Sequence, residues 1–177
     1  TPDFLREGEV ESLNKNCKNA RERFLISVLF DGGMRAEEFH NLRFEDIDIK
    51  EDKVKITLKG EYSKTKGRSI GLYWKYSFEA VRDYLEERKK LSYQPGEPVF
   101  KRSYKTTRVF LHRLGHRVLN RPIHYHLFRH SSATYYASKL NRQQLCFRYG
   151  WRFSSPMPDR YISRDGLDNK ELDEKFE

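Results

Sequence analysis

Residues 53–72 read KVKITLKGEYSKTKGRSIGL, and this stretch decides the fold class that the sequence predicts. Val54, Ile56 and Leu58 alternate with lysine or threonine, which is the pattern of a strand with one buried face. The polar residues 60–67 predict a turn, and residues 68–72 predict the returning strand. With a further strand at 46–49, the stretch predicts a small three-stranded antiparallel sheet.

Helices are predicted on both sides of this sheet. The expected helical ranges are 6–14, 20–31 and 35–42 before it, and 77–91, 107–119, 127–140 and 142–149 after it. Gly32 and Gly33 are expected to end the second helix, and Thr107 is expected to cap the fifth. Pro156 and Pro158 predict a tight segment that delivers Tyr161. We therefore expect an α+β domain that is mainly α, with the sheet on one edge.

Composition favours one basic domain with a polyanionic partner. The 177 residues carry a net charge of +9, and the last fourteen hold six acids and three bases, which leaves +12 on residues 1–163. Such a charge suits nucleic acid, although a basic protein without this partner has the same composition. No apolar run approaches the length of a membrane span. Cys17 and Cys146 lack metal or redox spacing, which favours reduced thiols in the cytoplasm.

Residues 33–42, GMRAEEFHNL, place Arg35 directly after the glycine pair. Glu38 lies three residues on and is expected to form a salt bridge with the Arg35 side chain. A guanidinium group can donate two parallel hydrogen bonds to a phosphate, so Arg35 is a candidate anion ligand. A surface arginine paired with a nearby acid would give the same local pattern.

The predicted hairpin turn carries several cations, among them Lys64, Lys66 and Arg68. A two-stranded ribbon can enter a DNA groove, and a lysine at its tip can protonate a leaving oxygen. A solvated loop would have the same composition.

The sequence HLFRH begins at His126 and places His126 and Arg129 on one side of a helix. Imidazole exchanges protons near neutral pH, whereas guanidinium only stabilises negative charge. A metal site is the alternative, but no carboxylate or cysteine completes a ligand set. Its histidines would be His124, His126 and His130, with His112 and His116 as further candidates.

Residues 149–162 read YGWRFSSPMPDRYI. Taken alone, Trp151 and Tyr161 in this stretch are candidate core aromatics. In chain order, however, the four segments resemble the tyrosine recombinase (integrase) family. That family carries an arginine, a lysine, His-x-x-Arg, a histidine or tryptophan, and a tyrosine. The resemblance covers about Leu5 to Ile162, and residues 150–162 are most similar to integrases of archaeal plasmids and viruses.

The resemblance implies a role for each matched residue. Arg35 and Arg129 would grip the scissile phosphate, and His126 would assist proton transfer. Trp151 stands where histidine is more usual, so it can donate one N–H but cannot act as a base. Lys64 would be the general acid, with Lys59 and Lys66 as rivals, and Tyr161 would form a 3′-phosphotyrosine. Further DNA contacts are expected from Lys66, Arg68, His130, Arg152 and Arg160.

The resemblance also implies partners and domain limits. We expect double-stranded DNA and other protomers in a tetrameric synapse, with no cofactor, metal ion or ATP. Residues 1–163 would form the catalytic domain, and the acidic tail 164–177 would pack in cis or in trans. The family's N-terminal core-binding domain is expected to be absent from this chain. A type IB topoisomerase-like enzyme, a catalytically inactive DNA-binding module and a metal-dependent nuclease are the competing interpretations.

Overall fold

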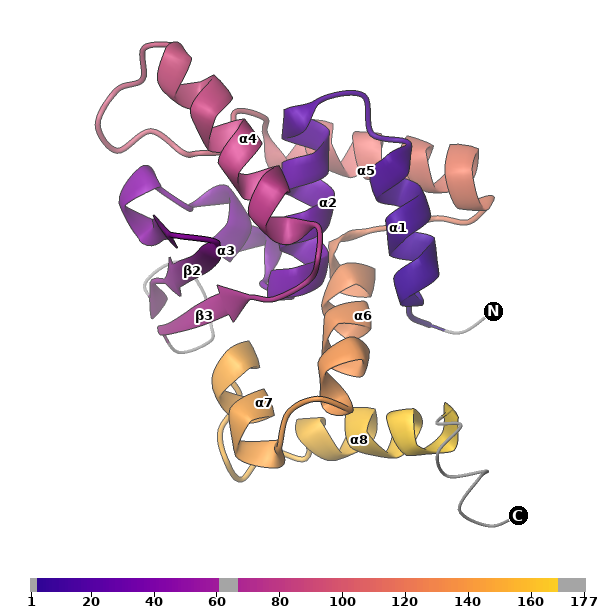
Figure 1. The fold of residues 1–177 in the computed structure, drawn as a ribbon. Helices are drawn as coiled ribbons and strands as arrows, with labels where there is room; N and C mark the ends of the chain where they lie inside the picture. Colours follow the sequence, from indigo (N-terminus) through magenta and orange to yellow (C-terminus); the bar gives the residue numbers. More distant parts are fainter. Residues whose placement is uncertain (1–2, 61–66, 169–177) are drawn as a thin grey trace.

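The computed structural model describes residues 3–60 and 67–168, with side chains as far as residue 162 (Figure 1). In chain order the elements are α1 (Glu7–Lys15), α2 (Ala20–Gly32), α3 (Ala36–His40), the 3-10 turn η1 (Phe44–Asp46), β1 (Ile47–Lys50), β2 (Lys53–Leu58), β3 (Arg68–Leu72), α4 (Ser77–Lys90), α5 (Tyr104–Leu119), α6 (Tyr125–Ala137), α7 (Arg142–Tyr149) and α8 (Met157–Asp168). The predicted fold class, mainly helical with a three-stranded antiparallel sheet, is confirmed.

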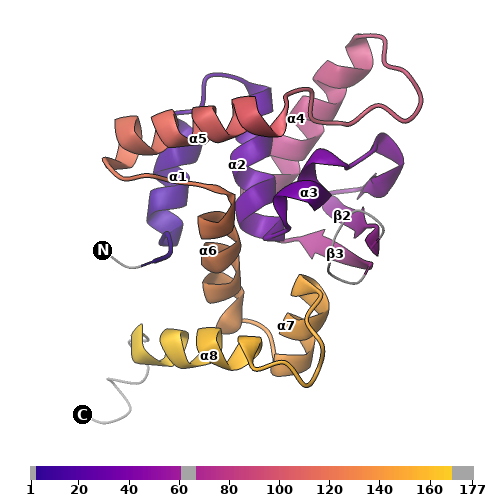
Figure 2. The same cartoon turned by 180° about the vertical axis from the view of Figure 1, so that it is seen from behind.

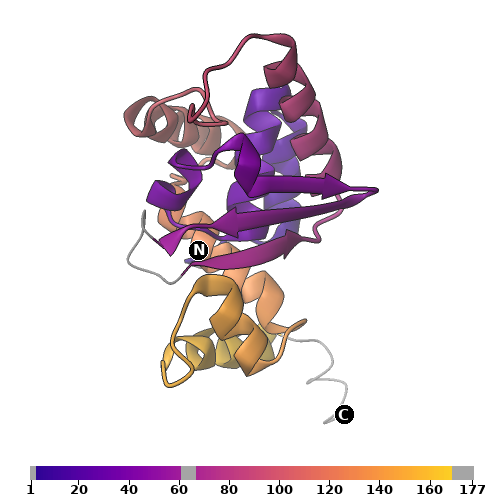
Figure 3. The same ribbon diagram turned by 90° about the vertical axis from the view of Figure 1, so that its left-hand side faces the viewer.

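The sheet has the strand order β1-β2-β3, and both pairs are antiparallel. Ile56 at its centre faces Ile47 on one side and Ile70 on the other. The alternating apolar residues of β2 are buried as predicted, because this face packs on α2 and α4. Figure 3 shows the strands lying across these helices at one edge of the domain.

Helix α2 is the centre of the main hydrophobic core. Its residues from Phe24 to Gly32 are all buried, which is typical of a helix covered on every side. It contacts α1, α4, α6 and β3, and Figure 2 shows it behind α5 between these elements.

A second, smaller core lies where α6, α7 and α8 meet. It is formed by Ala133, Tyr136, Ala137, Leu145, Tyr149 and Tyr161. Figure 1 shows α6 leaving the main body and ending beside α7 and α8. The tyrosine predicted to be the nucleophile is therefore part of a packed cluster.

Asp31 joins the two cores. Its buried carboxylate accepts hydrogen bonds from the backbone N–H of Trp74 at 2.8 Å and from Ser77 Oγ at 2.7 Å. The Tyr136 hydroxyl also donates to it, and Arg148 Nη2 lies 3.1 Å away. One side chain on α2 thus links the start of α4 to α6 and α7.

The predicted cap of the fifth helix is wrong. Helix α5 begins at Tyr104 because Ser103, not Thr107, is its cap: Ser103 Oγ accepts from the Thr106 N–H at 3.1 Å. Thr107 is buried in the first turn instead, where its hydroxyl donates to the Ser103 carbonyl at 2.8 Å.

The segment that delivers Tyr161 is helical, a feature that the sequence pattern left unassigned. Helix α8 begins at Met157, so Pro158 lies in its first turn. Backbone N–H groups in a first turn have no partner within the helix, so the N–H that proline lacks is not missed there. The helix continues to Asp168, and the expected domain boundary at residue 163 falls inside it. Across residues 3–60 and 67–168, no helix is long and apolar enough to cross a bilayer.

Asp31→Asn is expected to destabilise the protein by roughly 3 kcal/mol, because it leaves the buried Arg148 guanidinium without its carboxylate. Urea unfolding measures this loss as a lower midpoint at unchanged slope. Asp83→Asn is the matched control: Asp83 is partly exposed and, among the described residues, pairs with the adjacent Arg82, so its effect should stay within about 0.5 kcal/mol. Equal midpoints for the two variants would contradict the bridging role of Asp31.

Candidate active site

Helix α6 carries the histidines and one arginine of the site. His124 is its N-cap, and the Nδ1 atom of His124 accepts the Leu127 N–H at 3.2 Å. His126 lies in the first turn, and Arg129 and His130 follow one turn later.

The Arg129 guanidinium is held by the ends of two other helices. Nη1 donates to the Gly33 carbonyl and Nη2 to the Tyr149 carbonyl, both at 2.8 Å. Gly33 ends α2 in the left-handed region at φ 58°, and a side chain there would come within 2.6 Å of Ser132 and Tyr149. The glycine is therefore required for the close packing that orients Arg129.

Arg35 lies two residues beyond Gly33, at the start of α3. Its backbone N–H donates to Glu38 Oε1 at 2.9 Å, which fixes the turn into the helix. Its side chain is half-buried, and the Nε atom finds no hydrogen-bond partner among the described residues. A buried donor without a partner costs free energy unless a ligand supplies the acceptor.

The predicted salt bridge between Arg35 and Glu38 is wrong. Glu38 instead pairs with Arg68, at 2.7 Å between Nη1 and Oε2. Both side chains are 1% exposed, and Arg68 Nε also donates to the Arg148 carbonyl at 2.8 Å. Arg68 is therefore buried and is not available as the DNA contact that was predicted.

The alternation of residues along β3 could have predicted that Arg68 is buried. Arg68 shares its face of the strand with Ile70 and Leu72, which point into the core. Glu38 thus holds the backbone of Arg35 with one oxygen and is itself fixed by Arg68.

Arg35, His126 and Arg129 line one pocket of about 280 Å³. Burial, and then the neighbouring Arg35, lowers the pKa of Arg129 to about 10, so its guanidinium remains charged at neutral pH. Burial, and then Arg129, lowers the pKa of His126 below its usual range. The pocket therefore concentrates positive charge and favours an anion.

Tyr161 lies beside this pocket rather than in its lining. Its ring stacks on Trp151 with centroids 5.6 Å apart and planes at 7°, and the residue is 2% exposed. Its hydroxyl forms a hydrogen bond of 2.5 Å with His130 Nδ1. Tyr161 is a core aromatic in this structure, as its sequence context alone suggested.

Trp151 connects the pocket to Tyr161. The Arg129 guanidinium carbon lies 5.8 Å from the centroid of the Trp151 ring, which also stacks on Tyr161. The following loop is held by Arg142, whose Nη1 donates to the Phe153 carbonyl at 2.6 Å. Arg142 also contacts Asp159 in the first turn of α8, at 3.3 Å.

Of the three lysines predicted as candidates for the general acid, the structure describes Lys59. Lys64 and Lys66 lie outside the described residues. The Lys59 ammonium group lies 2.9 Å from Glu45 and 3.3 Å from Asp46, and the hydrogen bond to Glu45 raises its pKa. Lys59 is thus engaged by carboxylates at the end of β2.

The remaining residues that were predicted to contact DNA differ in their exposure to solvent. Arg152 and Arg160 are exposed near the start of α8. His130, another predicted DNA contact, is partly buried and forms a hydrogen bond with Tyr161. In the described part of the chain, no three His, Cys, Asp or Glu side chains are placed to hold a metal ion.

Two residues of this pocket were missed by sequence reasoning. Tyr104 and Arg108 extend from α5 to its rim. Tyr104 is 52% exposed and stacks on Tyr125 at 5.0 Å between centroids. The available signal was the absence of any acid in the basic helix Tyr104–Leu119.

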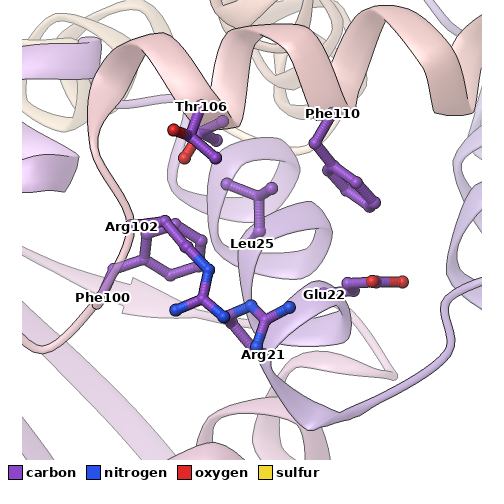
Figure 4. A pocket seen from close by; sticks show the side chains of 8 residues that line it. Arg21, Glu22, Leu25, Phe100, Arg102, Thr106 and Phe110 are labelled. Atoms are coloured by element: carbon purple, nitrogen blue, oxygen red, sulfur yellow. The ribbon is translucent and has the colours of Figure 1, made fainter.

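A separate pocket lies between α2 and α5 (Figure 4). Arg21 and Arg102 border it, and Leu25, Phe100 and Phe110 give it an apolar lining. It shares no residue with the pocket that Arg35 and Arg129 line.

Several known proteins are similar in sequence to this chain. The chain is 30% identical over 145 residues to a tyrosine recombinase of Pseudothermotoga lettingae, covering 78% of this chain and 48% of that protein. It is 34% identical over 95 residues to the tyrosine recombinase XerC of Staphylococcus aureus, covering 51% and 30% respectively. The matched region thus spans half or less of the length of these curated relatives.

Solved structures share the fold at lower identity. The XerA recombinase superposes with a TM-score of 0.77 at 19% identity, over 95% of this chain and 65% of that one. The Tn1549 transposon integrase in complex with transposon right end DNA gives 0.72 at 16% identity, over 99% and 66%. The sequence profile described as the phage integrase family matches residues 3–164. This chain therefore belongs to the phage integrase family.

Proposed function

We propose that this chain is the catalytic domain of a site-specific DNA recombinase that cleaves and rejoins strands through Tyr161. The observation that carries the proposal is the convergence of Arg35, His126 and Arg129 on one pocket, with Tyr161 adjoining it through Trp151. Family membership and the tyrosine recombinase from Pseudothermotoga lettingae support the same reaction.

The scissile phosphate would occupy this pocket. Its non-bridging oxygens gain negative charge in the transition state, and two guanidinium groups stabilise that charge. Arg129 is fixed by helix-end carbonyls. The Nε atom of Arg35 has no hydrogen-bond partner in residues 3–60 and 67–162, so its N–H can donate to a phosphate oxygen. His126 would add a hydrogen bond or a proton from the same side of α6.

The phenol oxygen of Tyr161 would attack the phosphorus and displace the 5′-oxygen of the next nucleotide. The product is a 3′-phosphotyrosine and a free 5′-hydroxyl, and the leaving oxygen takes its proton from Lys64. The covalent bond conserves the energy of the phosphodiester, so a 5′-hydroxyl of another strand can reverse the step without ATP. Because Tyr161 is 2% exposed, α8 must shift toward the pocket before attack.

Double-stranded DNA and further protomers are the proposed partners. Structures of similar fold include XerH bound to its difH substrate and a lambda integrase tetramer bound to a Holliday junction. Lys66, Arg152 and Arg160 would contact the DNA backbone near the pocket. The acidic residues 164–177 would pack on this domain or on a neighbouring protomer.

We also propose an origin and a cellular location for the protein. The segment 150–162 resembles integrases of archaeal plasmids and viruses, which favours a mobile genetic element as the source. The protein would act in the cytoplasm, on DNA.

Tyr161→Phe should keep the ring stacked on Trp151 and lose only the reacting hydroxyl. It should bind DNA but form no SDS-stable adduct with nicked duplexes of randomised sequence. Gel electrophoresis and mapping of the modified residue measure this result. Tyr93 is an exposed tyrosine that is not part of the pocket lining, so Tyr93→Phe should still form the adduct. An adduct that persists in Tyr161→Phe would exclude Tyr161 as the nucleophile.

Lys64→Ala should slow cleavage of an ordinary substrate by about 10²–10⁴-fold, because the leaving oxygen loses its proton donor. A bridging 5′-sulfur leaves without protonation, so this substrate should restore the rate of Lys64→Ala. Single-turnover cleavage assays compare both substrates. Selective rescue of Lys66→Ala or Lys59→Ala would transfer the acid to that residue.

DNA binding should become tighter as the pH falls, through His126. Its pKa lies below the usual value of 6.5 in the free protein, and a bound phosphate should raise it. Affinity is then greatest below the free-state pKa and is lost as pH rises through the bound-state pKa. A rise of one unit strengthens binding about tenfold.

Fluorescence anisotropy between about pH 5.5 and pH 8 measures this dependence at constant salt. His126→Gln should flatten it, whereas His116→Gln, on the exposed face of α5, should not. An identical slope in both variants would show that other groups take up the proton.

A further inference from the structure

We propose that His130 is a further catalytic residue, which accepts the phenolic proton of Tyr161 before that oxygen attacks phosphorus. The inference rests on the proposed function and adds a role that the resemblance did not assign. His130 touches the reacting atom itself, because its Nδ1 lies 2.5 Å from the Tyr161 hydroxyl oxygen.

The ring and the hydroxyl group of Tyr161 have different contacts. Stacking on Trp151 and burial in the second core hold the ring, and the His130 ring lies beside it with centroids 5.9 Å apart. The hydroxyl group contacts Nδ1 of His130. An imidazole nitrogen at this distance is within reach for proton transfer.

The position of His130 on α6 also favours this role. His126 lies four residues earlier on the same face, and the two imidazole centroids are 4.4 Å apart. His126 lines the pocket proposed for the phosphate, whereas His130 adjoins Tyr161. A phenol oxygen that moves from His130 toward the pocket therefore passes along one face of one helix.

The balanced step has one proton acceptor and one proton donor. The phenolic proton moves to Nδ1 of a neutral His130 ring that carries its hydrogen on Nε2, and the Tyr161 oxygen then forms its bond to phosphorus. The bond between phosphorus and the 5′-oxygen breaks, and that oxygen takes a proton from Lys64. In religation, His130 returns its proton to Tyr161. No oxidant, reductant or further reactant is needed.

A tyrosine that needs no base provides the test. Tyr161 is replaced site-specifically by a fluorinated tyrosine whose hydroxyl ionises near neutral pH, in the native chain and in His130→Asn. Asparagine places an amide nitrogen near the position of Nδ1 but cannot accept a proton. The substrate carries a bridging 5′-sulfur, so leaving-group protonation does not limit the rate.

With ordinary Tyr161, His130→Asn should cleave about 10²–10⁴-fold more slowly than the native chain. With the fluorinated residue, the gap should fall below about tenfold, since the nucleophile is already ionised. His116→Asn, an exposed histidine on α5, should match the native chain with both residues. A partial folding defect of His130→Asn lowers the rates of this variant with both nucleophiles by the same factor, so it cancels when the two gaps are compared.

Three outcomes would overturn the role of His130. An equal deficit with both tyrosines would make it a packing residue, and no deficit would leave it without a catalytic part. If the native chain with ordinary Tyr161 forms no adduct, the proposed function itself fails, and the role of His130 fails with it. That result differs from the other two, in which the native chain reacts. His130→Gln is tested in parallel, so that an effect caused by the asparagine side chain itself is recognised.

Discussion

The buried guanidinium group of Arg129 sets the arrangement of the site. It is held by the carbonyls of Gly33 and Tyr149, which lie at the ends of α2 and α7. Helix-end carbonyls carry partial negative charge and lack partners within their own helix, so they satisfy a buried cation without cancelling its charge. A carboxylate in their place would have neutralised Arg129. The carbonyl contacts hold the arginine and leave a full positive charge for an anion.

The carboxylates of this region contact other arginines. Glu38 pairs with Arg68, and Asp31 lies beside Arg148. These buried pairs connect α3 with β3 and α2 with α7, and they fix the frame around the pocket. Their acids compensate the charges of Arg68 and Arg148, while Arg35 and Arg129 face the pocket. Charge compensation in the frame therefore coexists with a pocket whose described lining residues include no carboxylate, and this separation is consistent with the proposed phosphodiester substrate.

Tyr161 takes part in packing and, in the proposed reaction, also in the chemistry. Its ring contributes to the second core, and its hydroxyl meets His130. The proposed reaction requires this residue to leave part of that cluster, and the cluster is small, formed mainly by α6, α7 and α8. Movement of α8 need not disturb the main core around α2, because the two cores are separate clusters linked through Asp31. A domain with one continuous core would resist such a movement more strongly.

The sequence by itself determined the period of β2 and the helical segments, because alternation and local spacing are written along the chain. Arg35, His126, Arg129 and Tyr161 were singled out by the resemblance to the family, and their roles are proposals. The sequence did not determine which acid pairs with which arginine, since Glu38 pairs with Arg68 and not with the expected Arg35. It also did not predict helix α8, which follows Pro156. Those outcomes were decided by the tertiary structure. Arg129 and Gly33 are 96 residues apart, and Arg68 and Glu38 are 30 apart. Contacts over such separations depend on how whole helices and strands pack, which no local pattern encodes.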